Sequence, residues 1–153
     1  MKRLPLSLLA LVFAQAVQAG GFTALDRQGA RALTDPGQHR QPTIIALWSS
    51  DCVHCKKNLA LFAAMAKADR RLRVITVATE PDSPALGPLL DKNGVGGTRY
   101  AYGSDNPEAI AYALDANWAG ELPRTLFYDG RGRQTKVSGV IKPDDALRAV
   151  TPQ

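Results

Sequence analysis

Apolar runs and helix-like repeats alternate through the first half of the chain. Residues 43–48, Thr-Ile-Ile-Ala-Leu-Trp, form a continuous apolar run, which is typical of a buried central strand. Three helix-capping residues follow at 49–51, and apolar side chains then recur at helical spacing, so we predict a helix over residues 52–68. A second apolar run over residues 72–78 predicts another strand.

The alternation continues in the second half of the chain. The predicted elements are a helix over 85–92, a strand over 98–102, a helix over 106–114, a hairpin of strands over 125–128 and 134–140, and a helix from Pro143. Near the start, we expect short extended pieces at 22–26 and 31–33 and a turn-rich stretch over 34–42. This order predicts an α/β fold, in which helices flank a central mixed sheet and residues 84–115 form an inserted helix–strand–helix segment.

The first 19 residues follow a different pattern. Lys2 and Arg3 precede an apolar run over residues 4–14, and Val17-Gln18-Ala19 has small residues at the spacing of a signal-peptidase site. The run is about half of the ~20 residues that a membrane-spanning helix needs, which favours cleavage over anchoring. We therefore predict a signal peptide at residues 1–19 and one periplasmic domain at residues 20–153.

Composition and charge narrow the function. The chain is 45% hydrophobic and 22% charged, as in ordinary globular domains. Its net charge is +5, and without Lys2 and Arg3 it is +3, which is too small to indicate nucleic-acid binding. Only two cysteines are present, and a disulfide between them closes so short a loop that it removes only about 2 kcal/mol of unfolded-state entropy. The pair is therefore better suited to redox exchange than to structural cross-linking.

The cysteines fall where the predicted strand ends and the helix begins. Unpaired amide groups and the helix dipole at such a position stabilise a thiolate, which is the attacking species in disulfide exchange. We predict that Cys52 attacks and that Cys55, one turn later on the buried side, resolves the mixed disulfide. His54 lies close enough to stabilise the Cys52 thiolate, which would favour the reduced form and make the couple more oxidising.

Two segments resemble the thioredoxin superfamily, in particular its exported TlpA-like thiol–disulfide oxidoreductases. Trp48-Ser-Ser-Asp-Cys52-Val-His-Cys55-Lys56 is similar to the family's Trp-x-x-x-Cys-x-x-Cys-Lys segment. Residues 120–130, which contain Pro123, are similar to its second signature. The resemblance covers about residues 22–150 and implies a thioredoxin-like fold.

The resemblance also implies roles for further residues. Pro123 is expected to be a cis-proline that packs against the disulfide, and Leu122 to offer its backbone to an extended substrate segment. Trp48 is expected to shape the surface near the motif, with plain packing in the core as the alternative, and Val53 to contact substrate.

Three positions depart from the family pattern. Ala46 stands where typical thioredoxins have a buried aspartate, and Asn58 stands where some reductases have a glutamate, so no familiar carboxylate accepts the proton of Cys55. Glu80, after the second strand, either approaches Cys55 as its proton acceptor or lies in an exposed loop, and we expect the exposed loop. Asp51 replaces a tryptophan, where it either opposes the Cys52 thiolate or caps the helix.

The favoured function is dithiol–disulfide exchange with exported cysteine-containing proteins, mainly in the reductase direction. This exchange requires no organic cofactor. We expect the protein to be a monomer and its dithiol to be regenerated by a membrane redox partner. The alternative is copper binding or delivery, because Cys52, His54 and Cys55 offer soft ligands. A structural zinc site needs a fourth ligand, and the only other imidazole, His39, is expected to be solvated. A peroxiredoxin-type peroxidase is disfavoured, because this chain lacks the proline- and threonine-containing segment that precedes the reactive cysteine of such enzymes. A non-catalytic binding module is disfavoured by the intact Cys-x-x-Cys motif.

Overall fold

The computed structural model describes residues 21–152. The predicted signal peptide lies outside the described residues. The strands are β1 (Phe22–Leu25), β2 (Thr43–Trp48), β3 (Arg73–Pro81), β4 (Thr98–Tyr102), β5 (Arg124–Tyr128) and β6 (Gln134–Ser138). The helices are α1 (Arg27–Thr34), α2 (Val53–Ala68), α3 (Leu86–Lys92), α4 (Pro107–Leu114) and α5 (Pro143–Val150), with a short 3-10 turn at Pro36–Gln38.

The strands form one mixed sheet in the order β1-β4-β3-β2-β5-β6. Strands β1, β4, β3 and β2 run parallel to one another, whereas β5 is antiparallel to both β2 and β6. All six residues of β2 are buried, as its continuous apolar run predicts for a strand covered on both faces. The predicted mixed sheet is confirmed.

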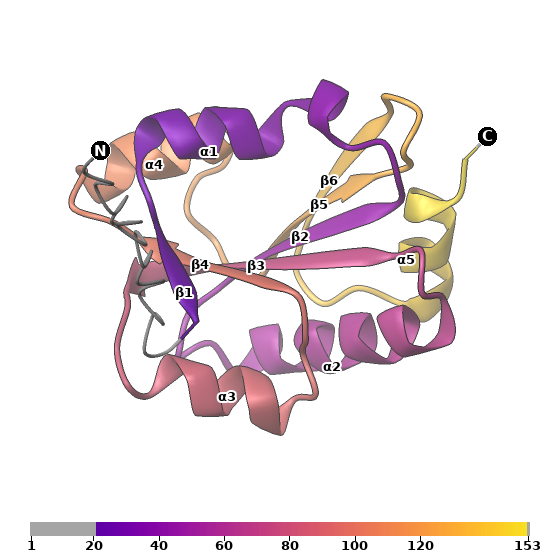
Figure 1. Ribbon diagram of the computed structural model, residues 1–153, viewed down its shortest axis with the longest axis horizontal. Helices are drawn as coiled ribbons and strands as arrows, with labels where there is room; N and C mark the ends of the chain where they lie inside the picture. The colour runs from indigo at the N-terminus through magenta and orange to yellow at the C-terminus, as the bar shows by residue number, and fades with distance from the viewer. Residues whose placement is uncertain (1–20, 153) are drawn as a thin grey trace, which may run out of the picture.

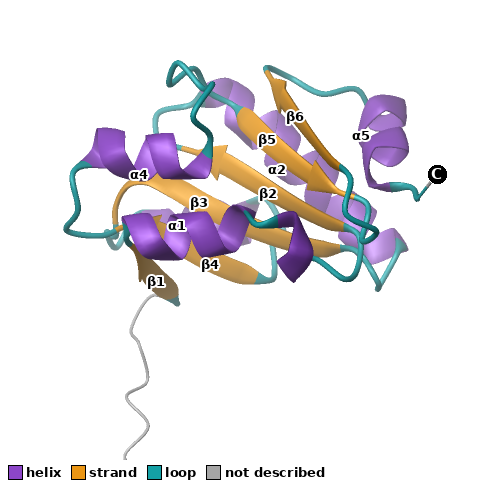
Figure 2. Cartoon of the chain, turned by 90° about the horizontal axis from the view of Figure 1, so that it is seen from above, coloured by secondary structure: helices purple, strands orange, loops and turns teal. Residues whose placement is uncertain are grey.

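Helices cover both faces of the sheet (Figures 1 and 2). Apolar residues of α2, α3 and α5 pack against one face, where Ile44, Ala46 and Trp48 of β2 point. Apolar residues of α1 and α4 pack against the other face, together with Ile45 and Leu47. Alternate residues of one strand therefore belong to two separate cores, as the pleat of a β-strand requires. Below, the side with α2 is called the redox face and the side with α1 the opposite face.

Most predicted elements are confirmed, including the helix–strand–helix insertion formed by α3, β4 and α4. The predicted extended piece at 31–33 is wrong, because these residues belong to α1. Asp26 caps this helix by accepting a hydrogen bond from the Gly29 amide at 2.6 Å. The helix is short, and only Ala30 and the partly buried Leu33 face the core, so its apolar repeat covers too few positions to be told from an extended piece. Strand β6 also ends earlier than predicted, before Gly139, which has a φ of 90°.

Candidate functional site

The cysteine pair lies where β2 ends and α2 begins. Cys52 is the N-cap residue of α2, and its sulfur accepts a hydrogen bond from the Cys55 amide at 3.1 Å. The Cys52 amide donates to the Ser49 carbonyl at 3.2 Å, which closes the turn between strand and helix. The predicted position of Cys52 at the helix N-terminus is confirmed, and Cys52 rather than Asp51 is the cap.

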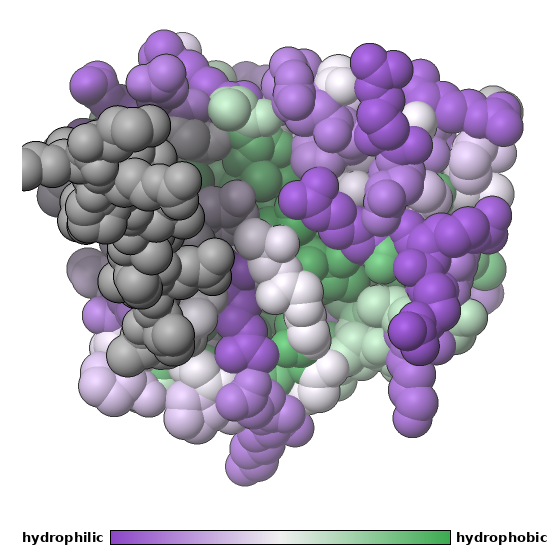
Figure 3. All heavy atoms as spheres, in the orientation of Figure 1, coloured by the Kyte–Doolittle hydropathy of each residue, from purple (hydrophilic) through white to green (hydrophobic). Residues whose placement is uncertain are grey.

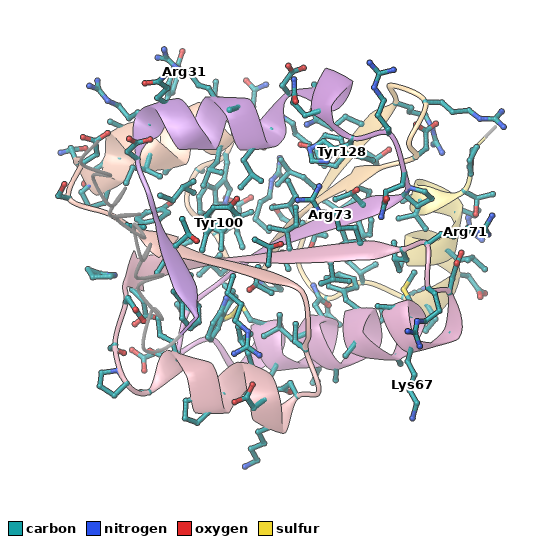
Figure 4. All side chains as sticks on the ribbon, viewed as in Figure 1. Arg31, Lys67, Arg71, Arg73, Tyr100 and Tyr128 are labelled. Carbon is teal, nitrogen blue, oxygen red and sulfur yellow. A yellow bond between two sulfur atoms is a disulfide. The ribbon has the colours of Figure 1, made fainter. Side chains whose placement is uncertain are left out.

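The two cysteines form a disulfide, with sulfurs 2.05 Å apart, at the start of α2 (Figure 4). Cys55 is 1% exposed and belongs to the core of the redox face, whereas Cys52 is half-buried. Val53 is 66% exposed, and His54 is exposed as well. An incoming molecule therefore meets Cys52, Val53 and His54 but not Cys55.

The segment before β5 has the geometry that the resemblance implies. The Leu122–Pro123 peptide bond is cis. Pro123 is buried, and its carbonyl accepts a hydrogen bond from the Gly139 amide at 2.9 Å. Leu122 is half-buried and packs against the cores of both faces. Gly139 therefore joins the Pro123 segment to the loop that follows β6.

Asn58 connects that loop to α2. Its side chain is buried, and its amide nitrogen donates to the Gly139 carbonyl at 3.0 Å, while its amide oxygen accepts from the Ile141 amide at 3.0 Å. Val140, between these two anchors, is 50% exposed. The sequence marks Asn58 only as a departure from a family pattern. The structure shows that it ties α2 to the segment bonded to Pro123.

Glu80 was expected in an exposed loop, and that expectation is wrong. Its side chain is half-buried near the end of β3 and accepts hydrogen bonds from the Ser50 amide and, at 3.0 Å, from the Ser50 hydroxyl. Ser50 lies in the turn that leads to Cys52. The carboxylate therefore holds this turn, and both of its oxygens are already bonded.

Trp48 is part of the core rather than of the surface. It is 1% exposed, and its carbonyl accepts a hydrogen bond from the Thr79 hydroxyl at 3.2 Å. A side chain buried to this extent does not touch a substrate, so the predicted surface role does not fit. Trp48 supports the site from beneath.

His39 was expected to be solvated, and this too is wrong. It is 4% exposed, its Nε2 lies 2.8 Å from the Leu33 carbonyl oxygen, and its ring lies 3.9 Å from that of Tyr128. Burial lowers the pKa of His39, an effect that the hydrogen bond to Leu33 partly offsets. Tyr128 points toward α1 in Figure 4, so His39 lies on the opposite face, away from the cysteines.

Nothing in the described part of the chain adds support to the copper alternative. Across residues 21–152, no three His, Cys, Asp or Glu side chains are grouped in a way suited to a metal ion.

A buried ionic cluster stabilises the start of β5. The Asp115 carboxylate, 0% exposed, bonds to the Arg124 guanidinium at 2.6 Å and to the Lys136 ammonium at 2.9 Å. Burial alone would raise the pKa of Asp115, but the hydrogen bonds from Arg124 and Lys136 lower it overall. Arg124 directly follows Pro123, so the cluster also holds the segment that contains the cis peptide bond.

An apolar groove lies elsewhere on the molecule. Figure 3 shows apolar side chains gathered in the middle of one face, surrounded by hydrophilic ones. The groove is lined by alanines of the C-terminal half of α2 and by residues 93–98, with Lys67, Arg70 and Arg73 among its cations. Neither cysteine lines it, so we assign it no part in the redox site.

The fold is similar to that of several solved disulfide oxidoreductases. A secreted disulfide oxidoreductase of Mycobacterium tuberculosis, homologous to E. coli DsbE, matches with a TM-score of 0.61 and 20% identity over 85% of this chain and 94% of that one. A thiol:disulfide interchange protein of Chlorobium tepidum matches with a TM-score of 0.60 and 18% identity over 74% and 80%. A secreted thiol-disulfide isomerase of Corynebacterium glutamicum matches with a TM-score of 0.58 and 19% identity over 76% and 72%.

A comparison with protein-family models and with characterised proteins finds no match to this sequence. The solved structures nevertheless confirm the predicted fold: the chain has the fold of the thioredoxin superfamily, with a Cys-x-x-Cys pair at the start of α2. Among residues 21–152, no helix is both long and apolar enough to cross a membrane.

Proposed function

We propose that this chain is an exported thiol–disulfide oxidoreductase that exchanges electrons with exported cysteine-containing proteins, mainly as a reductase. The observation that carries the proposal is the unequal cysteine pair. Cys52 is half-buried and its sulfur accepts an amide hydrogen bond at the N-terminus of α2, whereas Cys55 is 1% exposed. An amide donor at a helix N-terminus stabilises a thiolate, which is the attacking form. The disulfide oxidoreductases that share this fold support the proposal.

The reaction transfers two electrons in two steps. The Cys52 thiolate attacks one sulfur of a substrate disulfide, forms a mixed disulfide and releases the first substrate thiolate. The Cys55 thiolate then attacks the Cys52 sulfur, closes the Cys52–Cys55 disulfide and releases the second substrate thiolate. Both released thiolates take up protons. The substrate is reduced and the enzyme is oxidised, so the cycle needs no organic cofactor but does need a dithiol donor, which we assign to a membrane redox partner.

The surface around Cys52 suits an extended protein segment. We assign substrate contacts to the exposed Val53 side chain and to the backbone of Leu122, beside Pro123, along which a segment adds as a strand. The exposed Val140 extends this apolar surface, because Gly139 is bonded to Pro123. His54 stabilises the reduced form from the exposed side of the motif.

Substitution of each cysteine tests the mechanism. With the reduced protein and a disulfide-containing protein such as insulin, we expect Cys52→Ala to abolish reduction and Cys55→Ala to accumulate a mixed disulfide visible on a non-reducing gel. Lys67→Ala, on the same helix but in the separate groove, serves as the control and should reduce at the wild-type rate. Reduction by Cys52→Ala at the wild-type rate would overturn the proposal.

Equilibration with glutathione tests the direction. We expect a reduction potential between about −270 and −120 mV, the values of strongly reducing and strongly oxidising members of this class. His54→Pro should lower the potential. A thioredoxin-like potential that His54→Pro leaves unchanged contradicts the assigned role of His54.

Export is tested separately. Expression of the full chain in a bacterial host should yield a periplasmic protein whose mass corresponds to residues 20–153. A cell-associated protein of full-length mass would contradict the predicted cleavage.

A further inference from the structure

Three buried polar atoms beneath the redox helix have no hydrogen-bond partner among the described residues. They are the indole nitrogen of Trp48 and the hydroxyls of Thr76 and Thr125. Trp48 is 1% exposed, and both threonines are 0% exposed. Buried polar side chains are bonded in the great majority of cases, either to protein or to internal water. Three such atoms in one region therefore indicate a polar site inside the core.

Strand register places these groups around Ala46. On one side Ala46 pairs with Thr76 of β3, and on the other it pairs with Thr125 of β5. Residues that pair directly project from the same face of a sheet, and so do residues two apart in one strand, such as Trp48. The two hydroxyls and the indole therefore lie on one face, flanking the small methyl group of Ala46.

This face is the redox face. Ala46, Trp48 and Cys55 belong to the same hydrophobic cluster, which also contains the apolar side chains of α2. Ile44 and Trp48 are large, so Ala46 is the small residue of β2 on this face. Buried polar groups that flank a small residue are groups that internal water typically satisfies.

Cys55 must lose a proton before it can attack Cys52, and its burial keeps the thiol away from bulk solvent. The buried carboxylates of the described residues are committed elsewhere. Asp115 is bonded to Arg124 and Lys136, and Asp129 bonds the amides of the β5–β6 turn. Glu80 holds Ser50.

We propose that Trp48, Thr76 and Thr125 form an internal hydration site through which the proton of the Cys55 thiol leaves. The inference rests on the proposed thiol–disulfide exchange. As the mixed disulfide resolves, Cys55 gives its proton to internal water held by these groups, and this proton is balanced by the one that the released substrate thiolate takes up. The Cys55 thiolate then forms its bond to Cys52, and the substrate thiolate leaves and takes up a proton. Thr76 and Thr125 are positioning residues, because they act through the water.

A reaction with 5,5′-dithiobis(2-nitrobenzoate) separates the two chemical steps. The first thionitrobenzoate released from reduced protein reports the attack by Cys52, and the second reports the resolution by Cys55. We expect the Thr76→Val/Thr125→Val double variant to slow the second release by about 10-fold or more at pH 7, since positioned proton transfer contributes about 100-fold or more. The dependence of the second release on pH should move to higher pH, and the first release should be unchanged.

Two controls separate this role from a structural one. Thr43→Val removes a buried hydroxyl from the same strand as Ala46, and that hydroxyl bonds the Gln41 carbonyl instead. It should leave both releases at the wild-type rate. Thr76→Ser/Thr125→Ser restores the hydroxyls and should restore the second release. Equal second-release rates and pH profiles in wild type and the double valine variant would overturn the inference.

A crystal structure of the reduced protein provides an independent readout. We expect ordered water within about 3 Å of the Thr76 and Thr125 hydroxyls, which is ordinary hydrogen-bond distance. A dry site, or hydroxyls bonded only to backbone carbonyls, would overturn the inference while exchange activity persists. Loss of the second release in the wild-type protein itself would instead overturn the proposed function.

Discussion

Arg124 and Thr125 are neighbours in β5, yet they project from opposite faces of the sheet into two different buried polar regions. Arg124 enters an ionic cluster in which the Asp115 carboxylate receives the Arg124 guanidinium at 2.6 Å and the Lys136 ammonium at 2.9 Å. Thr125 enters the region around Ala46, where its hydroxyl has no partner among the described residues.

The difference separates two uses of buried polar groups. A buried charge is tolerated only when it is paired and hydrogen-bonded, so the cluster around Asp115 has to be complete. Burying an uncharged hydroxyl without a protein partner costs much less free energy than burying an unpaired charge, and internal water is able to bond to the hydroxyl. We therefore expect substitutions at Asp115 and its partners to change folding stability, and substitutions around Ala46 to change the chemistry of Cys55.

The largest expected effect is the loss of Arg124. In Arg124→Met the Asp115 carboxylate keeps Lys136 but loses its closest partner, and breaking a buried ion pair typically costs about 3–5 kcal/mol. Urea unfolding of the oxidised protein measures this loss. Lys136→Met is the control. It should lower the free energy of unfolding by less than Arg124→Met does, because the Lys136 side chain is 30% exposed and Arg124 remains in place. A loss below about 1 kcal/mol in Arg124→Met would show that the cluster behaves like a surface ion pair.

Asn58→Ala should have the next largest effect. Asn58 lies on the redox face, but both ends of its amide are bonded, to Gly139 and Ile141. We expect the substitution to lower the free energy of unfolding by about 2–3 kcal/mol, because it leaves one donor and one acceptor without partners. It should also slow insulin reduction by loosening the loop that carries Val140.

Asn93→Ala is the matched control for Asn58. The side-chain amide of Asn93 makes a single hydrogen bond, to the Leu89 carbonyl in α3, and Asn93 is only half-buried. Asn93→Ala should lower the free energy of unfolding by less than Asn58→Ala does and should leave the rate of insulin reduction unchanged. Equal losses in the two variants would mean that the connection through Asn58 adds nothing specific.

We expect His39 to make a smaller contribution, which is a dependence of the free energy of unfolding on pH. Burial lowers its pKa below the ordinary value of 6.5, with Arg73 acting in the same direction and the bond to Leu33 and the charge of Asp35 acting against it. Below about pH 6.5 the unfolded chain binds a proton that the folded chain does not, so the free energy of unfolding should fall as pH drops. The slope is at most about 1.4 kcal/mol per pH unit.

Urea unfolding between pH 7 and pH 5 measures this slope. His39→Phe should flatten it. An unchanged slope in His39→Phe would assign the effect to other groups.

The smallest expected change in stability is that of the Thr76→Val/Thr125→Val double variant. Valine has nearly the shape of threonine and removes hydroxyls that have no partner among residues 21–152, so we expect the free energy of unfolding to stay within about 1 kcal/mol of wild type. Thr43→Val, which removes a bonded hydroxyl, should lose at least as much. If the double variant lowered the free energy of unfolding as much as Arg124→Met does, the residues around Ala46 would matter for stability as much as those around Asp115, against our expectation.

Local patterns were enough to predict most of the fold. The apolar run of β2, the helical repeat of α2 and the turn residues before β6 each act within a few positions of the chain. Helix α1 was missed because only Ala30 of that helix is buried. With Leu33, which packs against the same core, Ala30 forms a repeat of only two apolar positions, and this is too short to reveal a helix.

The long-range connections could not be predicted in this way. Glu80 and Ser50 are 30 positions apart, and Asn58 lies 81 positions from Gly139, so no local preference links them. His39 occupies a turn-rich stretch that looks exposed, and it is buried because Tyr128 packs against it. In each case the partner is brought close by the packing of whole elements.

Residues that are neighbours in the sequence were enough to place the cysteine pair at the start of a helix, directly after a buried strand. A cysteine pair between an apolar run and a helical repeat forms a thiol site at a helix N-terminus, because strand, cap and helix all depend on neighbouring residues. Only the tertiary structure decided the surroundings of that site. Strand register brought Thr76 and Thr125 to either side of Ala46, and helix packing covered them together with Cys55. Register and packing depend on the fit of all the elements together, which local sequence patterns do not contain.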